Sequence, residues 1–264
     1  MPLTTNEIAD EILTSKKYSG IDRVILERIC TETIPKYTSH KDIVKAVKKE
    51  LHIIHNSFLF ENCYTKADVL IDAYSGEGLT TDKAFAKKLM SLHASTRERL
   101  KQADEIYAYL SAFINAEDVI IDTGCGFNPF ALPFYTVLPK SYIALDISLS
   151  SICILTKYFR RANLPFRAEI YDAVVQAPCV KGDIILLLKL LPLLERQKKG
   201  LGFTLLEALD YRTVIVSFPT KSVSGKEKGM ETFYACRFEA ELPKRLTVLD
   251  KKVFANEMFY VLSK

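Results

Sequence analysis

From about residue 117 onward, short apolar runs alternate with stretches whose apolar residues recur every three or four positions. The first pattern is typical of buried strands and the second of helices packed against them. Such alternation folds as a mostly parallel sheet covered on both faces, so we expect an α/β, doubly wound domain over residues 111–264. The predicted strands are Val119–Asp122, Tyr142–Asp146, Arg167–Tyr171, Asp183–Leu188 and Thr213–Phe218, with helices at Leu149–Arg161 and Leu193–Leu209 and a closing antiparallel pair of strands at Tyr234–Phe238 and Phe254–Leu262.

Residues 1–110 have a mostly helical pattern, with a break between helices at Tyr74–Gly78. Their apolar residues are spaced by three or four, and capping residues such as Thr5, Ser39 and Thr81 precede several of the segments. The predicted helices are Thr5–Ser15, Asp22–Thr33, Ser39–Ile54 and Thr81–Leu92. We therefore expect a helical N-terminal extension, residues 1–110, in front of the sheet domain.

The composition excludes several classes of protein. No segment has the roughly 18 uninterrupted apolar residues of a membrane helix, and the first twenty residues lack the pattern of a secretory signal, so a cytoplasmic protein is expected. The six cysteines form no CxxC pair, which predicts reduced thiols and no metal site. A net charge of +4 weakly favours a polyanionic partner.

The segment Val119–Pro129 carries the first functional signal. A hydrophobic strand ends in Asp122 and runs into a turn with Gly124 and Gly126, which let the backbone approach a ligand closely. A dinucleotide site needs a third glycine to receive a pyrophosphate, and Pro129 stands in that place. The pattern therefore favours a cofactor without pyrophosphate, and S-adenosylmethionine is the common one. A simple tight turn is the alternative.

Two further acids end the next two predicted strands. Asp146 lies about 20 residues after the glycines, where a carboxylate can accept hydrogen bonds from both ribose hydroxyls. Asp172 would lie beside the adenine and accept from its exocyclic amine. Ile147 and Ala173, which follow these acids, are predicted to contact the cofactor too. Any one such acid is more often a strand-end cap, but three in succession favour a cofactor site.

The fourth strand is followed by Lys189 and Pro192, at the position that faces a transferable methyl group. The acidic or amide tetrad used to methylate exocyclic amines is absent here, and Pro178-Cys179 precedes the strand instead of following it, as a cytosine C5 nucleophile would. A ring nitrogen such as guanine N7 fits, because its lone pair can attack in line without first losing a proton. Lys189 and Pro192 are the predicted catalytic residues.

Two other segments are candidates for binding. Residues 91–100 contain His93 and arginines that could hold a methionine carboxylate in a bidentate pair, although a solvated helix face and a packed histidine fit the spacing equally well. The loop after the fifth strand contains Lys221, Lys226 and Lys228, which are predicted to contact RNA phosphates. A solvated loop is the alternative for this segment.

These segments together resemble the aminoglycoside-resistance 16S rRNA methyltransferases that modify N7 of a decoding-site guanine. The matching text spans nearly the whole chain: Ser15-Lys-Lys-Tyr18, His93-Ala-Ser-Thr-Arg-Glu-Arg99, Asp122 through Leu132, Leu187-Leu-Lys189-Leu-Leu-Pro192 and Ser217-Phe-Pro219 through Glu231. The His-Ala-Ser-Thr and Phe-Pro-x-Lys-Ser blocks are more specific than the glycine turn.

The resemblance implies the Rossmann-like, class I sheet of S-adenosylmethionine-dependent methyltransferases. It implies that Arg99 binds the methionine carboxylate, that the N-terminal helices dock on the 30S subunit, and that a monomer methylates a flipped guanine of 16S rRNA. Two alternatives stay open. The same domain could methylate another rRNA base or a small molecule, or the chain could be an RNA-binding module with a degenerate nucleotide fold.

Overall fold

The computed structural model describes residues 4–15, 17–55, 58–76, 78–175, 181–220 and 230–264. Its centre is a seven-stranded sheet in the order β3-β2-β1-β4-β5-β7-β6. The first five strands are parallel, as the sequence predicts, and β7 is antiparallel to both of its neighbours. The strands are β1 (Val119–Thr123), β2 (Ser141–Asp146), β3 (Arg167–Ile170), β4 (Gly182–Leu188), β5 (Tyr211–Pro219), β6 (Thr247–Phe254) and β7 (Glu257–Ser263).

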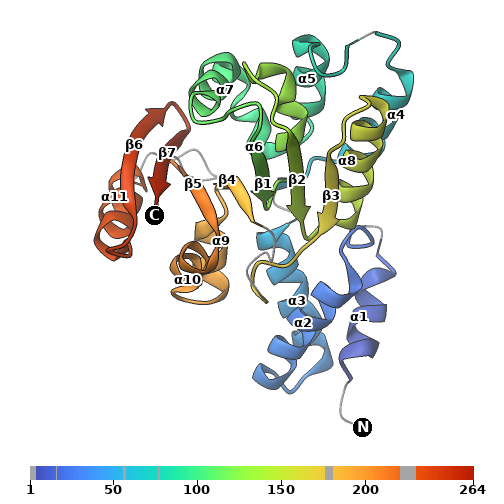
Figure 1. The fold of residues 1–264 in the computed structure, drawn as a ribbon. Helices are drawn as coiled ribbons and strands as arrows, with labels where there is room; N and C mark the ends of the chain where they lie inside the picture. Colours follow the sequence, from blue (N-terminus) through green and yellow to red (C-terminus); the bar gives the residue numbers. More distant parts are fainter. Residues whose placement is uncertain (1–3, 16, 56–57, 77, 176–180, 221–229) are drawn as a thin grey trace.

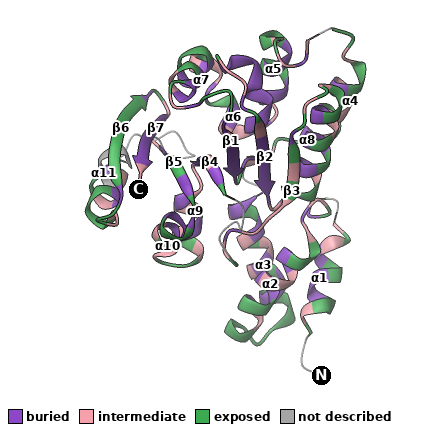
Figure 2. Cartoon of the chain, viewed as in Figure 1, coloured by how far each residue is buried: buried purple, intermediate pink, exposed green. Residues whose placement is uncertain are grey.

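Helices cover both faces of this sheet (Figure 1). The strands β1, β2, β4 and β5 are almost entirely buried, as Figure 2 shows in purple, which explains their continuous apolar sequences. The helices are α1 (Thr5–Leu13), α2 (Arg23–Thr33), α3 (His40–Ile54), α4 (Cys63–Ala73), α5 (Lys83–Met90), α6 (Ala94–Arg97), α7 (Ala103–Ser111), α8 (Leu149–Arg161), α9 (Leu191–Gln197), α10 (Leu201–Ala208) and α11 (Met230–Glu241).

The predicted N-terminal extension divides in two. Helices α1, α2 and α3 share their own apolar core between Ile8 and Ile54, which we call the N-terminal helical unit. Helices α4, α5 and α7 instead pack into the core of the sheet domain. Residue 110 thus marks the change from helices to strands but not a change of core. The N-terminal helical unit lies below the carboxyl ends of β1 and β2 (Figure 1).

Three predicted elements differ in the structure. Tyr234–Phe238 was expected to be a strand but lies inside α11, where Ala235 and Phe238 are buried three residues apart, a helical spacing. Phe254–Leu262 is not one strand: Ala255 and Asn256 turn the chain between β6 and β7. The predicted helix Leu193–Leu209 is two helices, because Gly200 adopts a φ of 82° between α9 and α10.

No helix among the described residues combines the length and the apolar character of a membrane span.

Candidate active site

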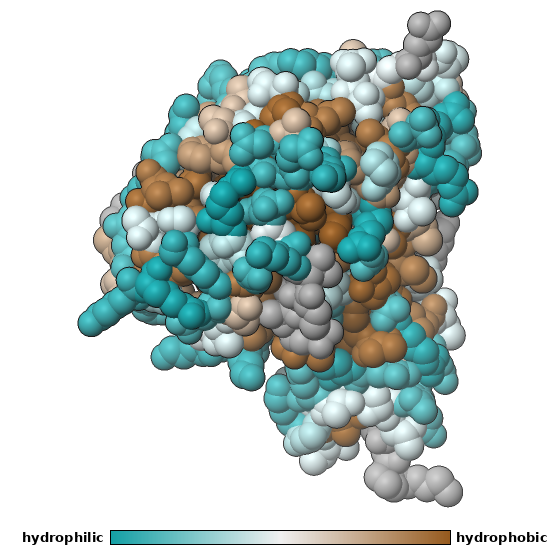
Figure 3. Space-filling model, in the orientation of Figure 1, coloured by the Kyte–Doolittle hydropathy of each residue, from teal (hydrophilic) through white to brown (hydrophobic). Residues whose placement is uncertain are grey.

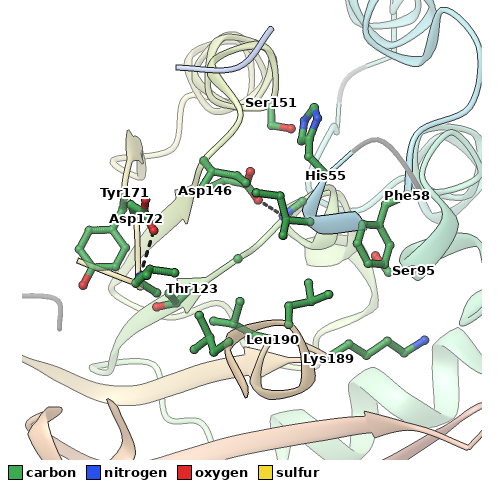
Figure 4. Close-up of a pocket in the computed structure, with 18 of the residues that line it drawn as sticks. His55, Phe58, Ser95, Thr123, Asp146, Ser151, Tyr171, Asp172, Lys189 and Leu190 are labelled. Carbon is green, nitrogen blue, oxygen red and sulfur yellow. Dashed lines mark hydrogen bonds between the residues drawn. The ribbon is translucent and has the colours of Figure 1, made fainter. Parts of the chain in front are cut away.

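A cavity lies at the carboxyl edge of the sheet, between the strand ends and the N-terminal helical unit (Figure 4). Open αβ sheets bind ligands at this edge. Eight of the residues predicted from the sequence line it: His93, Gly124, Gly126, Asp146, Ile147, Asp172, Ala173 and Lys189. Arg99, Asp122 and Pro192 are not among its lining residues, and Lys221, Lys226 and Lys228 lie outside the described residues.

The glycine turn shapes the floor of this cavity. Gly124 and Gly126 have φ values of 68° and 49°, a region that side chains disfavour. A Cβ atom on Gly124 would lie 2.9 Å from Leu190 Cδ1, and one on Gly126 would lie 3.0 Å from His93 Cε1. Both backbone conformations favour glycine, and a Cβ atom at either position would crowd Leu190 or His93.

Asp146 lies at the end of β2 and is held by the same turn. Its Oδ2 accepts a hydrogen bond of 2.8 Å from the Gly126 backbone N–H, and its Oδ1 accepts one of 2.9 Å from Ser148. The side chain points into the cavity, as Figure 4 shows, although the residue is only 8% exposed. Because each carboxylate oxygen can accept a second hydrogen bond, acceptor capacity remains for a diol such as ribose.

The cavity has two chemically different ends (Figure 4). Tyr171 and Asp172 lie on one side of Asp146. Ala173 and Val174, the next two residues of the chain, also line the cavity. Phe58, Ser95 and the Lys189 side chain lie on the other side. The first end thus offers apolar surface and a carboxylate, whereas the second offers an aromatic ring, a hydroxyl group and an ammonium group.

His93 packs between aromatic rings and forms part of the wall. Its ring stacks on Phe58 at 6.0 Å between centroids and contacts Phe127 at 5.4 Å, and its Nδ1 lies 2.9 Å from Ser95 Oγ. Burial lowers the pKa of His93 to about 3. His93 is therefore neutral at physiological pH, which suits packing and hydrogen bonding rather than proton transfer.

The resemblance implies that Arg99 binds the cofactor, but in the structure Arg99 does not line the cavity. It is 3% exposed, and its Nε and Nη2 each donate a 2.8 Å hydrogen bond to the Glu257 carboxylate. A third bond runs from Nη1 to Asn128 Oδ1 at 2.8 Å. The structure thus assigns the bidentate pair of Arg99 to a protein carboxylate, and a direct contact with the cofactor stays a prediction.

Glu257 links this buried pair to Lys189. The Lys189 ammonium lies 2.5 Å from Glu98 and 3.5 Å from Glu257, and the Ser217 hydroxyl donates to Glu257 at 2.5 Å. Although burial alone would raise the pKa of the Glu257 carboxyl, the charges of Arg99 and Lys189 hold it below its usual value. Lys189 itself has a φ of 58°, and its backbone N–H donates to Ser217. These contacts fix the Lys189 side chain at the edge of the cavity.

Pro192 lies in the first turn of α9 and faces away from this cavity. It lines a second cavity of about 230 Å³ with Phe203, Phe218 and Phe238. Pro192 is thus separated from the residues proposed to bind the cofactor, and a catalytic role for it stays a prediction.

Several residues of the site carry little signal in the sequence. Glu257 and Arg28 have no recognisable motif because their partners are distant in sequence: Arg99 and Lys189 for Glu257, and Asp172 for Arg28. Phe58 becomes part of the site only through its contact with His93. Only the acidic character of Glu257 next to the turn of the β6–β7 hairpin offered a local signal. In the described part of the chain, no cluster of His, Cys, Asp and Glu residues is arranged to hold a metal.

Asp122 lies below the glycine turn, where it is 1% exposed. Its Oδ2 accepts hydrogen bonds from the Tyr142 hydroxyl at 2.6 Å and from Asn128 Nδ2 at 2.9 Å. Its Oδ1 is buried and has no hydrogen-bond partner among the described residues. Burial raises the pKa of Asp122 to about 6, although the bonds from Tyr142 and Asn128 oppose that rise.

Asp122→Asn is expected to change how stability depends on pH. The pKa of Asp122 is 3.8 in the unfolded chain and about 6 in the folded protein. The wild-type protein therefore becomes less stable as the pH increases from 3.8 to about 6, because folding then disfavours the charged carboxylate. Asparagine keeps an acceptor for Tyr142 and Asn128, but it does not titrate, so the variant does not lose stability in this pH range. Relative to the wild type, the free energy of unfolding of the variant should therefore increase across this window by about 3 kcal/mol. Denaturant unfolding below and above the window measures it, and a pH-independent difference contradicts it.

Comparison with known proteins places this geometry in a family. A family model described as "Ribosomal RNA methyltransferase (FmrO)" matches residues 14–261. A protein of Serratia marcescens named 16S rRNA (guanine(1405)-N(7))-methyltransferase is 34% identical over 262 residues, covering 99% of both chains. A protein of the same name from Frankia casuarinae is 32% identical over 267 residues, covering 97% of this chain and 93% of the relative.

A solved structure agrees with the sequence comparisons. The crystal structure of the 16S rRNA methyltransferase RmtF in complex with S-adenosyl-L-homocysteine matches with a TM-score of 0.90 and 32% identity. The match covers 100% of this chain and 99% of that chain. The predicted fold class, the Rossmann-like sheet of class I methyltransferases with a helical extension, is thereby confirmed. The chain belongs to the ribosomal RNA methyltransferase (FmrO) family.

Proposed function

We propose that this chain transfers the methyl group of S-adenosylmethionine to N7 of a decoding-site guanine in 16S rRNA, and so confers resistance to aminoglycosides. The substrate is the 30S subunit in the cytoplasm. The observation that carries the proposal is the two-ended cavity at the carboxyl edge of the sheet, in a chain of this family.

The residues of the first end fit the cofactor. Gly124 and Gly126 keep the turn open where Cβ atoms would fill it, and Asp146 has acceptor capacity for the ribose hydroxyls. Asp172 has acceptor capacity for the adenine amine, and Ile147 and Ala173 line the same cavity. When bound, S-adenosylmethionine supplies an electrophilic methyl group on a sulfonium centre.

The second end suits a guanine. Phe58 offers a ring on which an unstacked base can lie, and Lys189 and Ser95 offer donors to its polar edge. The N7 lone pair attacks without losing a proton, so this end needs no general base, and the neutral His93 agrees with that requirement. Because Glu98 and Glu257 neutralise Lys189, the site tolerates the positive charge that methylation places on the ring.

The N-terminal helical unit provides a surface for RNA. Lys41, Lys45 and Lys49 are exposed and spaced by four residues, so they lie along one face of α3. Hydrophilic residues cover most of this unit in the view of Figure 3, at the bottom. We propose that this face contacts rRNA phosphates and that Lys221, Lys226 and Lys228 add contacts beside the target.

Replacing Lys41, Lys45 and Lys49 together by glutamine is expected to weaken binding to 30S subunits by about tenfold or more, because phosphate contacts are lost. The dependence of the binding constant on salt should become shallower for the same reason. Filter binding at several salt concentrations measures both. Lys140, Lys181 and Lys244, near the opposite edge of the sheet, are the matched control triple. Equal weakening in both triples contradicts docking through α3.

The test of the function is transfer of labelled methyl from S-adenosylmethionine to 30S subunits, 70S ribosomes and naked 16S rRNA. We expect label in 30S subunits only. Label in naked RNA or in a small molecule would favour the alternative methyltransferase reaction. Binding of 30S subunits without cofactor affinity would favour an RNA-binding module.

A further inference from the structure

Arg28, in the middle of α2, extends from the N-terminal helical unit into the cofactor cavity. Its Nε donates a 2.7 Å hydrogen bond to Asp172 Oδ2, and its Nη2 donates one of 3.3 Å to Gln197 Oε1 on α9. Its Nη1 lies 3.0 Å from Glu32, one turn further along its own helix. One guanidinium group thus connects α2, the end of β3 and α9.

This ion pair differs from the ordinary surface pairs of the protein. The Arg28 and Asp172 side chains are only 15% and 10% exposed, and both residues line the cavity. Arg23, on the same helix, also forms two ion pairs, but its side chain is 48% exposed and its partners are Asp10 and Glu27 of the N-terminal helical unit. Partly buried, charge-assisted hydrogen bonds hold a carboxylate far more firmly than solvated pairs do.

The contacts of Asp172 show what Arg28 does to it. One carboxylate oxygen accepts from Arg28, and the other, Oδ1, accepts a 3.0 Å hydrogen bond from the Val174 backbone N–H. The carboxylate is therefore held from two directions. Each oxygen can accept one more hydrogen bond, so the group is fixed in orientation and still able to receive a donor from the cavity.

We propose that Arg28 is the positioning residue for adenine recognition: it orients Asp172 toward the exocyclic amine and makes the N-terminal helical unit part of the cofactor site. The inference rests on the proposed use of S-adenosylmethionine. It predicts that Arg28 determines the preference for an adenine base over a base with oxygen at the same position, because a fixed carboxylate accepts from an amine and is repelled by a carbonyl oxygen.

The test compares the binding of S-adenosylhomocysteine and S-inosylhomocysteine by titration calorimetry. For Arg28→Ala we expect the Kd of the adenosyl compound to rise about tenfold while that of the inosyl compound changes little, so that discrimination collapses. Arg28→Lys keeps the positive charge but lacks the guanidinium group, so its discrimination should lie between those of the wild type and Arg28→Ala. Asp172→Asn should lose the same discrimination between the two compounds. Combining Arg28→Ala with Asp172→Asn should reduce this discrimination no further. Arg23→Ala, the matched control, should leave both Kd values unchanged.

Two results would overturn the proposal. Equal weakening of both compounds by Arg28→Ala would indicate a structural role only, and unchanged Kd values for both compounds in Arg28→Ala would remove any role in binding or recognition. Neither result affects the proposed function, which fails separately if the wild type does not bind S-adenosylhomocysteine or methylate 30S subunits.

Discussion

Asp146→Asn is expected to raise the Kd for S-adenosylhomocysteine by more than about 100-fold, because several hydrogen bonds to a charged acceptor are lost at once. The carboxylate accepts from the Gly126 and Ser148 backbone N–H groups through different oxygens. An asparagine amide must point its own donor at one of them. The glycine turn then loses a support at the point where the ribose is proposed to bind. Titration calorimetry measures the affinity, and methyl transfer to 30S subunits should fall in parallel.

Asp183→Asn is the matched control for this change. Asp183 also accepts a backbone hydrogen bond, 2.9 Å from Val119 N, but it lies at the opposite edge of the sheet near the start of β4. We expect the Kd of Asp183→Asn for S-adenosylhomocysteine to stay within about twofold of the wild type, because the lost hydrogen bond is remote from the site. Normal affinity in Asp146→Asn would show that the cofactor ribose is held elsewhere.

Glu257→Gln is expected to reduce the free energy of unfolding by about 3 to 5 kcal/mol, because it leaves the Arg99 guanidinium buried without its counter-charge. Arg99 and Glu257 are each at most 3% exposed at the side chain. Methyl transfer should be lost as well, since Glu257 also holds Lys189 through a 3.5 Å contact. Glu117→Gln is the control. It breaks an exposed pair with Lys140 and should change stability by less than about 1 kcal/mol.

A double variant separates stability from positioning. Replacing Arg99 and Glu257 together by methionine removes both buried charges, and such replacements are often neutral. We therefore expect denaturant unfolding of the double variant to approach that of the wild type while methyl transfer stays low. Full activity in the double variant would contradict a role for Glu257 in positioning Lys189, and wild-type stability of Glu257→Gln would contradict the buried pair.

The sheet and its cofactor edge could be predicted because their signals are local. The parallel strands β1, β2, β4 and β5 are buried and mostly apolar, and Gly124, Asp146 and Asp172 lie at or just after the ends of β1, β2 and β3. Parallel strands place those ends at one edge of the sheet, so sequence order alone brings the residues together. Helix α11 was mistaken for a strand because Phe and Tyr residues favour strands when considered without their helical spacing.

The parts that could not be predicted depend on long-range contacts. The charge of Arg99 suits a carboxylate of the cofactor. Only the folded chain shows that Glu257, at the start of β7, already pairs with its guanidinium group. Arg28 has no motif around it, and its partner Asp172 lies 144 residues away. Nor does local sequence show that α4, α5 and α7 join the core of the sheet domain.

The most direct test of the central claim is to map the methyl group in 16S rRNA after 30S subunits are incubated with the protein and S-adenosylmethionine. Methylation at N7 makes a guanine sensitive to strand cleavage after reduction, which identifies both the atom and the nucleotide. Relative to subunits incubated without the protein, we expect a single new cleavage, at a decoding-site guanine. A methyl group on another atom or outside the decoding site would contradict it.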